Sequence, residues 1–347
     1  MRKTKTTESF KRELKTSRPR ILLIHTGGTF GMTPSADSAH LSPGPYLDRL
    51  LTQLPELQEI AELSLEAPFN CDSAALEPAA ILQISNHIRE RASEYQGVVV
   101  IHGTDTMAFT ASVLGFTLAD ANIPIVLTGS QRPLAYIRSD ARSNLIDAVT
   151  LAAKEIPEIG ICFGDHWIRG VAANKNSVHR YGAFDSPNLP YLAELGLTIQ
   201  IYPHAGKFKR NVPAGVSGRL DCNIAVLTPH PGMPWEIAPP WAKAVLIQAY
   251  GAGNLPMDRP DLIRLFKDAD KRGLPIIITS QCASGGTDLS AYELGKKAAD
   301  LGAIPGGLHT RWAALAKLGL CLGASFDLSA IRNAFATEWA GEPVFSD

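Results

Sequence analysis

Two short runs of the chain combine threonine hydroxyls with glycines: residues 25–31 are HTGGTFG and residues 102–107 are HGTDTM. Each follows an apolar run, residues 21–24 and residues 98–101, that predicts a buried strand. The carboxyl ends of the strands in an open parallel sheet share one edge, where ligands bind. The two runs therefore indicate a site built on a threonine nucleophile rather than on serine or cysteine.

Thr29 is the candidate nucleophile of the first run. Gly27 and Gly28 allow a close approach of the backbone, so that Thr29 and nearby N–H groups can face a carbonyl carbon. A hydroxyl is a poor nucleophile unless a second group removes its proton. Thr104 and Asp105 are the candidates for that group. Their residue types also suit the cap of a following helix, and the two runs alone do not separate capping from catalysis.

The cysteines and histidines indicate neither a metal site nor a redox site. The five cysteines are odd in number and form no C-x-x-C pair, which argues against a disulfide framework and fits reduced thiols in a cytoplasmic protein. His25 and His102 each end a predicted strand, so we expect core or edge positions rather than metal ligation. Residues 26–31 match neither nucleotide-binding glycine fingerprint. No metal and no cofactor is therefore expected.

The segments that must position these residues alternate between strand and helix patterns. Strand patterns occupy residues 21–25, 97–102, 124–128, 159–163, 224–227, 244–248 and 275–280. Helical patterns occupy residues 47–54, 78–94, 106–120, 139–154, 259–271 and 288–301. Such alternation predicts an α/β fold in which helices cover both faces of parallel sheets.

The length of 347 residues favours two domains over a single core. Residues 203–222 are rich in Pro, Gly and basic residues and have no sustained periodicity, which predicts a linker; a surface loop inside one large domain is the alternative. We therefore expect a larger N-terminal α/β domain over residues 21–202, with a doubly wound and mostly parallel sheet. A smaller Rossmann-like α/β domain is expected over residues 223–347.

The first 20 residues form a separate basic segment, with eight Lys or Arg and two Glu. Low hydrophobicity and high charge predict a flexible tail, and nucleic-acid binding is the alternative interpretation. The rest of the chain has more acidic than basic residues, so no nucleic-acid partner is expected. The chain has neither a run of 18 apolar residues nor the apolar stretch of a secretory signal. We expect a cytoplasmic protein that does not span a membrane.

These motifs together resemble those of the bacterial-type L-asparaginases, most closely the cytosolic type I branch. Beyond the two threonine runs, the similarity includes residues 128–131 (TGSQ), 138–140 (RSD), 186–190 (SPNLP), 250–254 (YGAGN) and 281–282 (QC) with Gly285. It extends from about Ile21 to the C-terminal region and leaves only the basic tail outside. Two threonine motifs in the family's order, with matches in both halves, make the resemblance specific.

The resemblance implies the catalytic residues. Thr29 corresponds to the family's nucleophile, which attacks the side-chain amide carbon and forms a β-aspartyl ester. Thr104, Asp105 and Lys175 correspond to a second cluster, in which the lysine and the aspartate polarise the threonine. Without the resemblance, Lys175 would be interpreted as a solvated surface lysine.

The resemblance also implies the substrate-binding residues and the assembly. Asp72 and Ser73, with Thr104 and Asp105, correspond to the groups that bind the amino-acid end of the substrate. A carboxylate such as Asp72 or Asp105 suits an α-ammonium group, and hydroxyls and N–H groups suit the α-carboxylate. Asn254 corresponds to a residue that reaches the site of a neighbouring subunit. This assembly implies a homodimer or a homotetramer.

The chain departs from the family pattern beside the first threonine run. Residues 31–45 are small and turn-forming, which fits either a mobile lid or a plain exposed connection. The family has in this lid a tyrosine that assists proton removal, and His40 and Tyr46 are the candidate replacements here. Residues 74–76 (AAL) are less polar than in relatives, which affects substrate preference. Gln248 stands where some type I enzymes have an effector-site arginine, which argues against allosteric control by asparagine.

The resemblance thus leads us to expect hydrolysis of L-asparagine to L-aspartate and ammonia through a threonine acyl-enzyme. Asparagine and glutamine differ by one methylene group, which a pocket distinguishes by only about 1–3 kcal/mol. A glutaminase-asparaginase of broader specificity is therefore one alternative. A catalytically weak relative that binds amino acids is another, because the lid tyrosine is missing.

Overall fold

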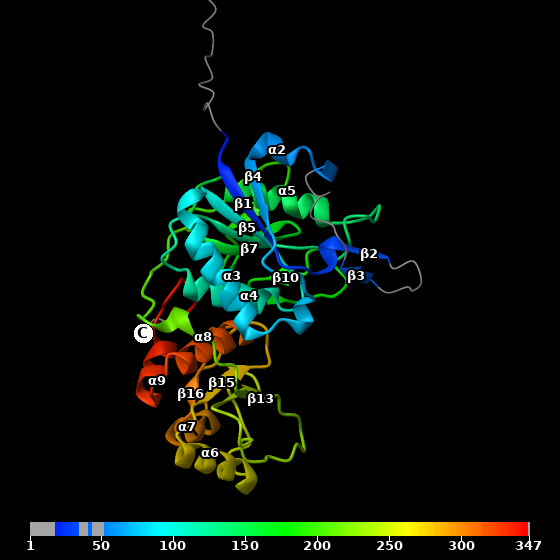
Figure 1. Ribbon diagram of the computed structural model, residues 1–347. Helices are drawn as coiled ribbons and strands as arrows, with labels where there is room; N and C mark the ends of the chain where they lie inside the picture. The colour runs from blue at the N-terminus through cyan, green and yellow to red at the C-terminus, as the bar shows by residue number, and fades with distance from the viewer. Residues whose placement is uncertain (1–17, 35–40, 44–51, 346–347) are drawn as a thin grey trace, which may run out of the picture.

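The computed structural model describes residues 18–34, 41–43 and 52–345, which form two α/β domains (Figure 1). In this part of the chain the larger sheet has eight strands in the order β12-β11-β8-β7-β6-β5-β1-β4. Strands β4, β1, β5, β6 and β7 are mutually parallel, and β8, β11 and β12 extend the sheet with antiparallel pairs. Their bounds are β1 (Arg20–His25), β4 (Glu62–Glu66), β5 (Gly97–Ile101), β6 (Ile125–Thr128), β7 (Ile159–Phe163), β8 (His166–Arg169), β11 (Ala193–Leu195) and β12 (Ile199–Ile201).

Helices cover both faces of this sheet. Leu22 and Ile24 of β1 pack on the face covered by α3 (Pro78–Arg91) and α4 (Met107–Thr117). Side chains alternate along a strand, so Ile21 and Leu23 pack on the opposite face with α2 (Leu57–Ile60) and α5 (Ala141–Ala152). The apolar runs of the parallel strands are thus buried on both faces. The predicted doubly wound, mostly parallel N-terminal sheet is confirmed.

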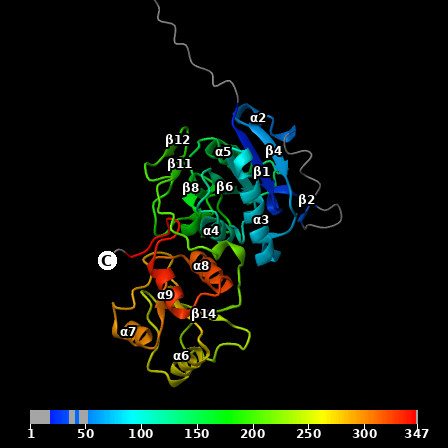
Figure 2. The ribbon, with the colours of Figure 1, turned by 60° about the vertical axis from the view of Figure 1, so that its left-hand side comes forward.

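The second domain has its own parallel sheet, in the order β13-β14-β15-β16. Its strands and helices are β13 (Ile224–Leu227), β14 (Ala244–Ala249), β15 (Ile276–Ser280), β16 (Ile304–Pro305), α6 (Pro260–Arg272), α7 (Glu293–Asp300), α8 (Arg311–Gly323) and α9 (Leu328–Ala336). Figures 1 and 2 both place α8 between this sheet and α4 of the first domain. The rings of Phe109 and Trp312 meet there with their centroids 6.2 Å apart. The smaller Rossmann-like C-terminal domain is confirmed as a separate parallel α/β unit.

Two small antiparallel pairs and five 3₁₀ turns complete the described elements. The first pair is β2 (Met32–Pro34) with β3 (Leu41–Pro43), and the second is β9 (Asn174–Lys175) with β10 (Phe184–Asp185). The turns are η1 (Thr29–Gly31), η2 (Ser73–Ala75), η3 (Ala92–Glu94), η4 (Gly170–Ala172) and η5 (Val216–Gly218).

Several elements differ from the sequence-based expectation. The helix expected over 288–301 begins at Glu293, because the Asp288 carboxylate accepts hydrogen bonds from the N–H and hydroxyl of Ser290 and forms a turn. Helices α8 and α9 and the strands β4, β8, β11, β12 and β16 were not expected. The α8 sequence is apolar around most of its circumference, which hides the helical period. The helix expected over 47–54 lies mainly outside the described residues.

The segment 203–222 forms turns and the short η5 between the two sheets. The domain boundaries that we placed there stay a prediction. Within residues 18–34, 41–43 and 52–345, no helix is long and apolar enough to cross a membrane.

Candidate active site

Two glycines pack the loop after β1 directly against its two neighbours. Gly27 forms a parallel bridge with Cys71, and a Cβ on Gly27 would lie 2.1 Å from the Cys71 carbonyl oxygen. A Cβ on Gly28 would lie 2.4 Å from the Cα of Gly103. The φ angles of Gly27 and Gly28 are +113° and +85°, a region that residues with a side chain rarely adopt. Glycine is therefore required at both positions for the loops after β4, β1 and β5 to converge.

Thr29 follows these glycines at the start of η1 and is half-buried. The next residue, Phe30, is 1% exposed, and its carbonyl accepts a hydrogen bond from the Leu134 N–H at 3.3 Å. The loop that follows β6 therefore covers the turn that carries Thr29. The candidate nucleophile thus lies on a constrained turn at the carboxyl edge of the sheet.

The second run lies beside it and is joined to a lysine from a distant strand. Lys175 Nζ on β9 donates hydrogen bonds to Thr104 Oγ1 and to Asp105 Oδ1, both at 2.8 Å. The Lys175 side chain is 13% exposed, whereas that of Asp105 is 62% exposed. An ammonium group that donates to a hydroxyl oxygen leaves the hydroxyl proton free to point elsewhere and polarises the oxygen. This arrangement can assist proton transfer at Thr104.

The structure also bears on the alternative that Thr104 or Asp105 caps the following helix. Helix α4 begins at Met107 with Thr106 as the N-cap residue and has no side-chain cap hydrogen bond. The Thr106 hydroxyl donates instead to the Ser73 carbonyl at 2.9 Å. The side chains of Thr104 and Asp105 therefore contact Lys175 rather than the helix terminus.

Asp72 and Ser73 lie on the third of the converging loops. The Asp72 carboxylate accepts the Ala74 N–H at 2.9 Å and caps η2. Ser73 is 3% exposed, and a Cβ on Gly103 would lie 2.5 Å from its Oγ. Strand order brings this loop beside the other two, because β4, β1 and β5 are adjacent in the sheet, and the glycines allow the close contact. The structure therefore places both residues beside the second threonine run.

The remaining predicted site residues lie apart or outside the described chain. Asn254 lies in the turn after β14 of the C-terminal domain, where its backbone pairs with Tyr250. In the described part of the chain, no hydrogen bond joins Asn254 to the Thr104 cluster. His40 and Tyr46 lie outside the described residues.

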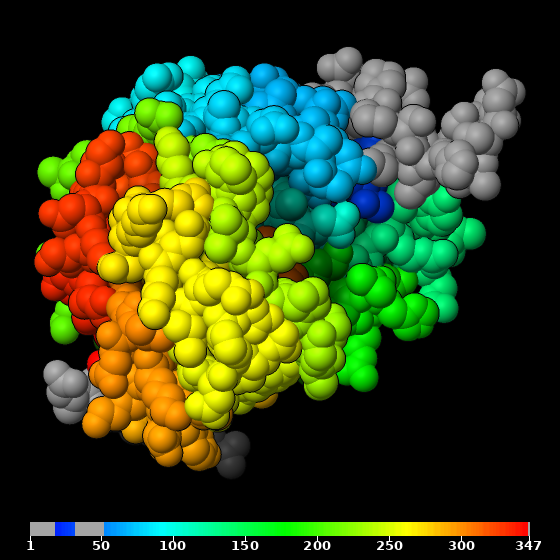
Figure 3. Space-filling model, turned by 90° about the horizontal axis from the view of Figure 1, so that it is seen from below, coloured from blue at the N-terminus to red at the C-terminus, as the bar shows by residue number. Residues whose placement is uncertain are grey.

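Gln248 lies on the wall of a cavity of about 320 Å³ between the two domains. Lys175 and Asn188 line the same cavity from the N-terminal side. In Figure 3 the surface is hollowed between yellow-green segments of the C-terminal domain and teal and green segments of the first domain. The Gln248 carbonyl oxygen Oε1 accepts a hydrogen bond from the Thr228 hydroxyl at 2.8 Å.

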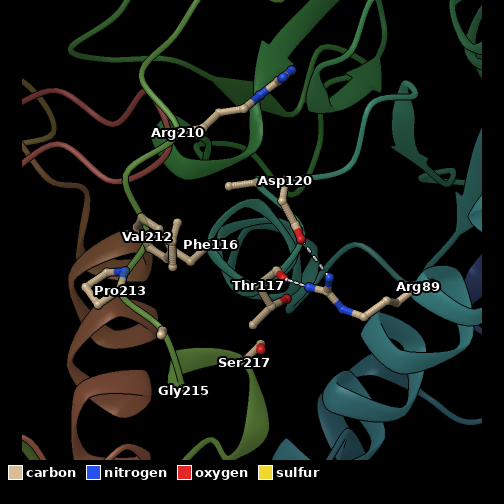
Figure 4. A pocket seen from close by; sticks show the side chains of 11 residues that line it. Arg89, Phe116, Thr117, Asp120, Arg210, Val212, Pro213, Gly215 and Ser217 are labelled. Atoms are coloured by element: carbon tan, nitrogen blue, oxygen red, sulfur yellow. Dashed lines mark hydrogen bonds and ion pairs between the residues drawn. The ribbon is translucent and has the colours of Figure 1, made fainter.

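A second cavity, of about 230 Å³, lies between α3, α4 and the segment around Arg210 (Figure 4). Arg89 donates there to the Asp120 carboxylate at 2.9 Å and to the Thr117 carbonyl at the end of α4. Its guanidinium group therefore stabilises the carboxyl end of α4. Arg89 and Asp120 pair with each other, and Arg210 donates to Asn122 and to the Pro157 carbonyl, which indicates packing rather than chemistry.

Sequence reasoning missed the contacts that hold the Lys175 segment. Gln131 Nε2 donates to the carbonyls of Ser177 and Arg180, at 3.4 Å and 3.1 Å, and so joins the loop after β6 to this segment. The Asp185 carboxylate contacts Asn176 in the same hairpin. No local pattern in the sequence marks the Gln131 contacts, because these partners are 46 and 49 residues apart. Among the described residues no group of three His, Cys, Asp or Glu is placed to bind a metal ion.

The doubly wound sheet, the smaller parallel domain and the polar cluster at the sheet edge define a two-domain α/β enzyme. Comparison with family models gives its family: an N-terminal asparaginase model matches residues 20–206, and a glutaminase/asparaginase C-terminal domain model matches residues 223–335. The chain therefore belongs to the asparaginase family and is an amidohydrolase.

Two of the similar proteins are L-asparaginases, and a third has a different name. L-asparaginase 1 of Escherichia coli is 32% identical over 338 residues, covering 93% of this chain and 97% of the relative. The solved structure of the thermostable L-asparaginase from Thermococcus kodakarensis matches with a TM-score of 0.82 and 30% identity, covering 94% of this chain and all of that one. A mouse protein named 60 kDa lysophospholipase is 34% identical, covering 93% of this chain and 62% of its own length.

Proposed function

We propose that this protein hydrolyses the side-chain amide of L-asparagine to L-aspartate and ammonia through an acyl-enzyme on Thr29. One observation carries the proposal: Lys175 Nζ lies 2.8 Å from both Thr104 Oγ1 and Asp105 Oδ1. Thr104 and Asp105 lie on the loop after β5, which packs against the turn that carries Thr29. Such a cluster supplies the proton transfer that a hydroxyl nucleophile requires.

The proposed reaction has two halves. Thr29 Oγ attacks the amide carbon, the C–N bond breaks, and the hydroxyl proton ends on the departing ammonia. Water then attacks the β-aspartyl ester, and proton transfer through Thr104 and Lys175 releases aspartate and restores the Thr29 hydroxyl. Backbone N–H groups near Thr29 and Thr104 stabilise both oxyanions, and a typical donor contributes about a hundredfold to a thousandfold in rate.

The same proposal assigns the substrate-binding groups. The α-ammonium group of the substrate pairs with Asp72 or Asp105, and the Ser73 hydroxyl with nearby N–H groups binds the α-carboxylate. The burial of Ser73 against Gly103 and the exposed carboxylate of Asp105 support this arrangement.

The nucleophile is tested by ammonia release from asparagine. We expect the wild type to release ammonia and Thr29→Ala to lose at least about a thousandfold in kcat, because the attacking oxygen is gone. Thr198→Ala, an exposed threonine between β11 and β12, is the matched control and leaves the rate unchanged. Full turnover by Thr29→Ala would contradict the assignment.

Two further measurements separate the alternatives. Comparing kcat/KM for asparagine and glutamine distinguishes an asparaginase from a glutaminase-asparaginase of broader specificity. Thermal stabilisation by asparagine without ammonia release would indicate an amino-acid-binding relative instead.

The proposal extends to the assembly and the location. We infer a cytoplasmic homodimer or homotetramer without a nucleic-acid partner, in which Asn254 reaches the neighbouring copy's site. The exposed apolar side chains of Ile137 and Val178 support a contact between copies, and their loops are joined by a hydrogen bond from the Tyr181 hydroxyl to the Arg138 carbonyl. Light scattering of the purified protein measures the state.

A further inference from the structure

Lys175 is carried by an unusually small element. Strands β9 and β10 have two residues each, with Lys175 opposite Phe184 and Asn174 opposite Asp185. The Asn176 N–H adds one bond to the Ala183 carbonyl at 2.8 Å. A two-stranded pair is marginally stable at best without other support. The position of the Lys175 ammonium therefore depends on the contacts that fix this hairpin.

A side-chain network joins the two neighbours of Lys175 to Asp185. Asp185 Oδ2 accepts a hydrogen bond from Asn176 Nδ2 at 3.2 Å. Asn176 Oδ1 accepts one from Asn174 Nδ2 at 2.6 Å. Alternate residues of a strand point to the same face, so Asn174 and Asn176 lie on the face opposite Lys175. The network thus holds the strand from behind while Lys175 faces Thr104.

The other oxygen of Asp185 connects the hairpin to the large sheet. Asp185 Oδ1 accepts hydrogen bonds from the Ser186 N–H at 2.7 Å and the Tyr191 hydroxyl at 2.8 Å. The hydrogen bond to Asp185 raises the pKa of Tyr191 to about 12. The neighbouring Leu192 N–H bonds to the carbonyl of Trp167 on β8, at 2.7 Å. One carboxylate thereby links the lysine-bearing strand to the segment that is bonded to β8, an inner strand of the large sheet.

We propose that Asp185 is a positioning residue for Lys175, holding its ammonium group at Thr104 and Asp105 through Asn176 and Tyr191. This inference rests on the proposed function only in taking the Lys175–Thr104 contact as catalytic. Within the described part of the chain, the Asp185 carboxylate bonds to Asn176, Ser186 and Tyr191 and to none of Thr29, Thr104 and Lys175. A misplacement of about 1 Å in a catalytic group costs up to about a hundredfold in rate.

The first test is the kinetics of Asp185→Asn. The amide keeps the shape of the carboxylate but replaces one acceptor with a donor, which cannot accept from both Asn176 and Tyr191. We expect kcat to fall about tenfold to a hundredfold, with KM for asparagine changed less than about twofold. In a protein that also carries Lys175→Met, Asp185→Asn produces no further loss of kcat, because the ammonium group that Asp185 positions is absent. An equal loss in the presence and absence of Lys175 would overturn the proposal.

Asp165→Asn is the matched control. Asp165 and Asp185 line the same surface cavity, which has a volume of about 510 Å³. The Asp165 carboxylate pairs with His166 at 2.8 Å rather than with the hairpin. We expect kcat and KM to be unchanged, and a kcat loss equal to that of Asp185→Asn would count against the inference. Tyr191→Phe removes only the link to the sheet, and it serves as the second variant if Asp185→Asn folds poorly. It lowers kcat in the same direction, and an unchanged kcat would contradict the inference.

The second test does not depend on catalysis. The rate at which acetic anhydride acetylates Lys175 is measured by peptide mass spectrometry, with exposed Lys207 as the internal reference. We expect Asp185→Asn to increase Lys175 labelling severalfold relative to Lys207, because the ammonium is released from Thr104 and Asp105. Unchanged labelling would refute the positioning role. If the wild type releases no ammonia, the proposed function fails, while this measurement still decides the inference.

Discussion

At the scale of single residues, burial keeps three histidines of the described chain neutral. His25 ends β1 directly before the glycine run, is 2% exposed, and has no hydrogen-bond partner for either ring nitrogen within the described part of the chain. Burial lowers its pKa to about 4. His102 and His309 are also buried, and desolvation is the main cause that lowers the pKa of each to about 4. None of the three is charged in the folded protein at neutral pH.

These histidines predict a loss of stability in mild acid. An unfolded histidine has a pKa of about 6.5, so between pH 6.5 and pH 4 the unfolded chain binds protons that the folded protein does not. The free energy of unfolding therefore falls as the pH decreases through this window. We expect His25→Leu to reduce this slope, since one of the three groups is removed. Urea unfolding at several pH values measures the slope of the free energy of unfolding against pH. Identical slopes for the wild type and His25→Leu would contradict the assignment of His25 as a buried neutral group.

At the scale of elements, the three loops at the edge of the large sheet act as one unit. The glycines after β1 permit the backbone contacts, and the order β4, β1, β5 places the loops side by side. The threonine motifs are thus brought together by close backbone packing of Gly28 against Gly103.

Gly28→Ala tests this packing. Its Cβ would lie 2.4 Å from the Gly103 Cα at a φ of +85°. We expect a loss of more than about 2 kcal/mol in stability, together with most of the ammonia release, because the loops must separate. Gly215→Ala is the control, since Gly215 has the same φ of +85° with no atom within 4 Å of the added Cβ. It carries only the conformational cost, about 1 kcal/mol, and keeps its activity. Similar behaviour of the two variants would disprove the steric explanation.

At the scale of the whole molecule, the C-terminal segment joins the two domains. Glu342 pairs with Lys317 of α8 at 2.6 Å, and both side chains are fully buried. The neighbouring Gly341 carbonyl accepts from Arg169 of β8 at 3.2 Å, and Trp339 packs edge-on against Phe116 of α4. The segment thereby contacts α8 in one domain and β8 and α4 in the other, beside the contact between α4 and α8.

Removing one partner of this buried ion pair has a large effect on stability. We expect Glu342→Ala to lower the free energy of unfolding by about 3–5 kcal/mol, because Lys317 is left buried without a counter-charge. Glu338→Ala is the control, because it removes a long ion pair, 3.8 Å, with the exposed Lys209. We expect it to lower the free energy of unfolding by less than about 1 kcal/mol. Denaturant unfolding measures both variants. A loss below 1 kcal/mol for Glu342→Ala would show that the pair does not support the structure.

Much of the fold was predictable because local periodicity carries it. The branched apolar runs that became β1, β5, β6 and β7 are buried on both faces and therefore stand out in the sequence. The antiparallel strands β11 and β12, at one side of the sheet, have three residues each and show no such period. Helix α8 was not predicted, because the contact between the domains buries it on most sides and its apolar residues therefore show no helical period.

The sequence was sufficient to locate the two threonine turns, because glycines and hydroxyls directly after apolar strands define the edge of a parallel sheet. Resemblance to a family added Lys175, which resembled an ordinary surface lysine. Only the tertiary structure placed its Nζ 2.8 Å from Thr104 and Asp105, some 70 residues away, and showed Asp185 behind its strand. The physical reason is that periodicity records which face a residue buries, whereas a contact between distant segments depends on how the strands and loops pack.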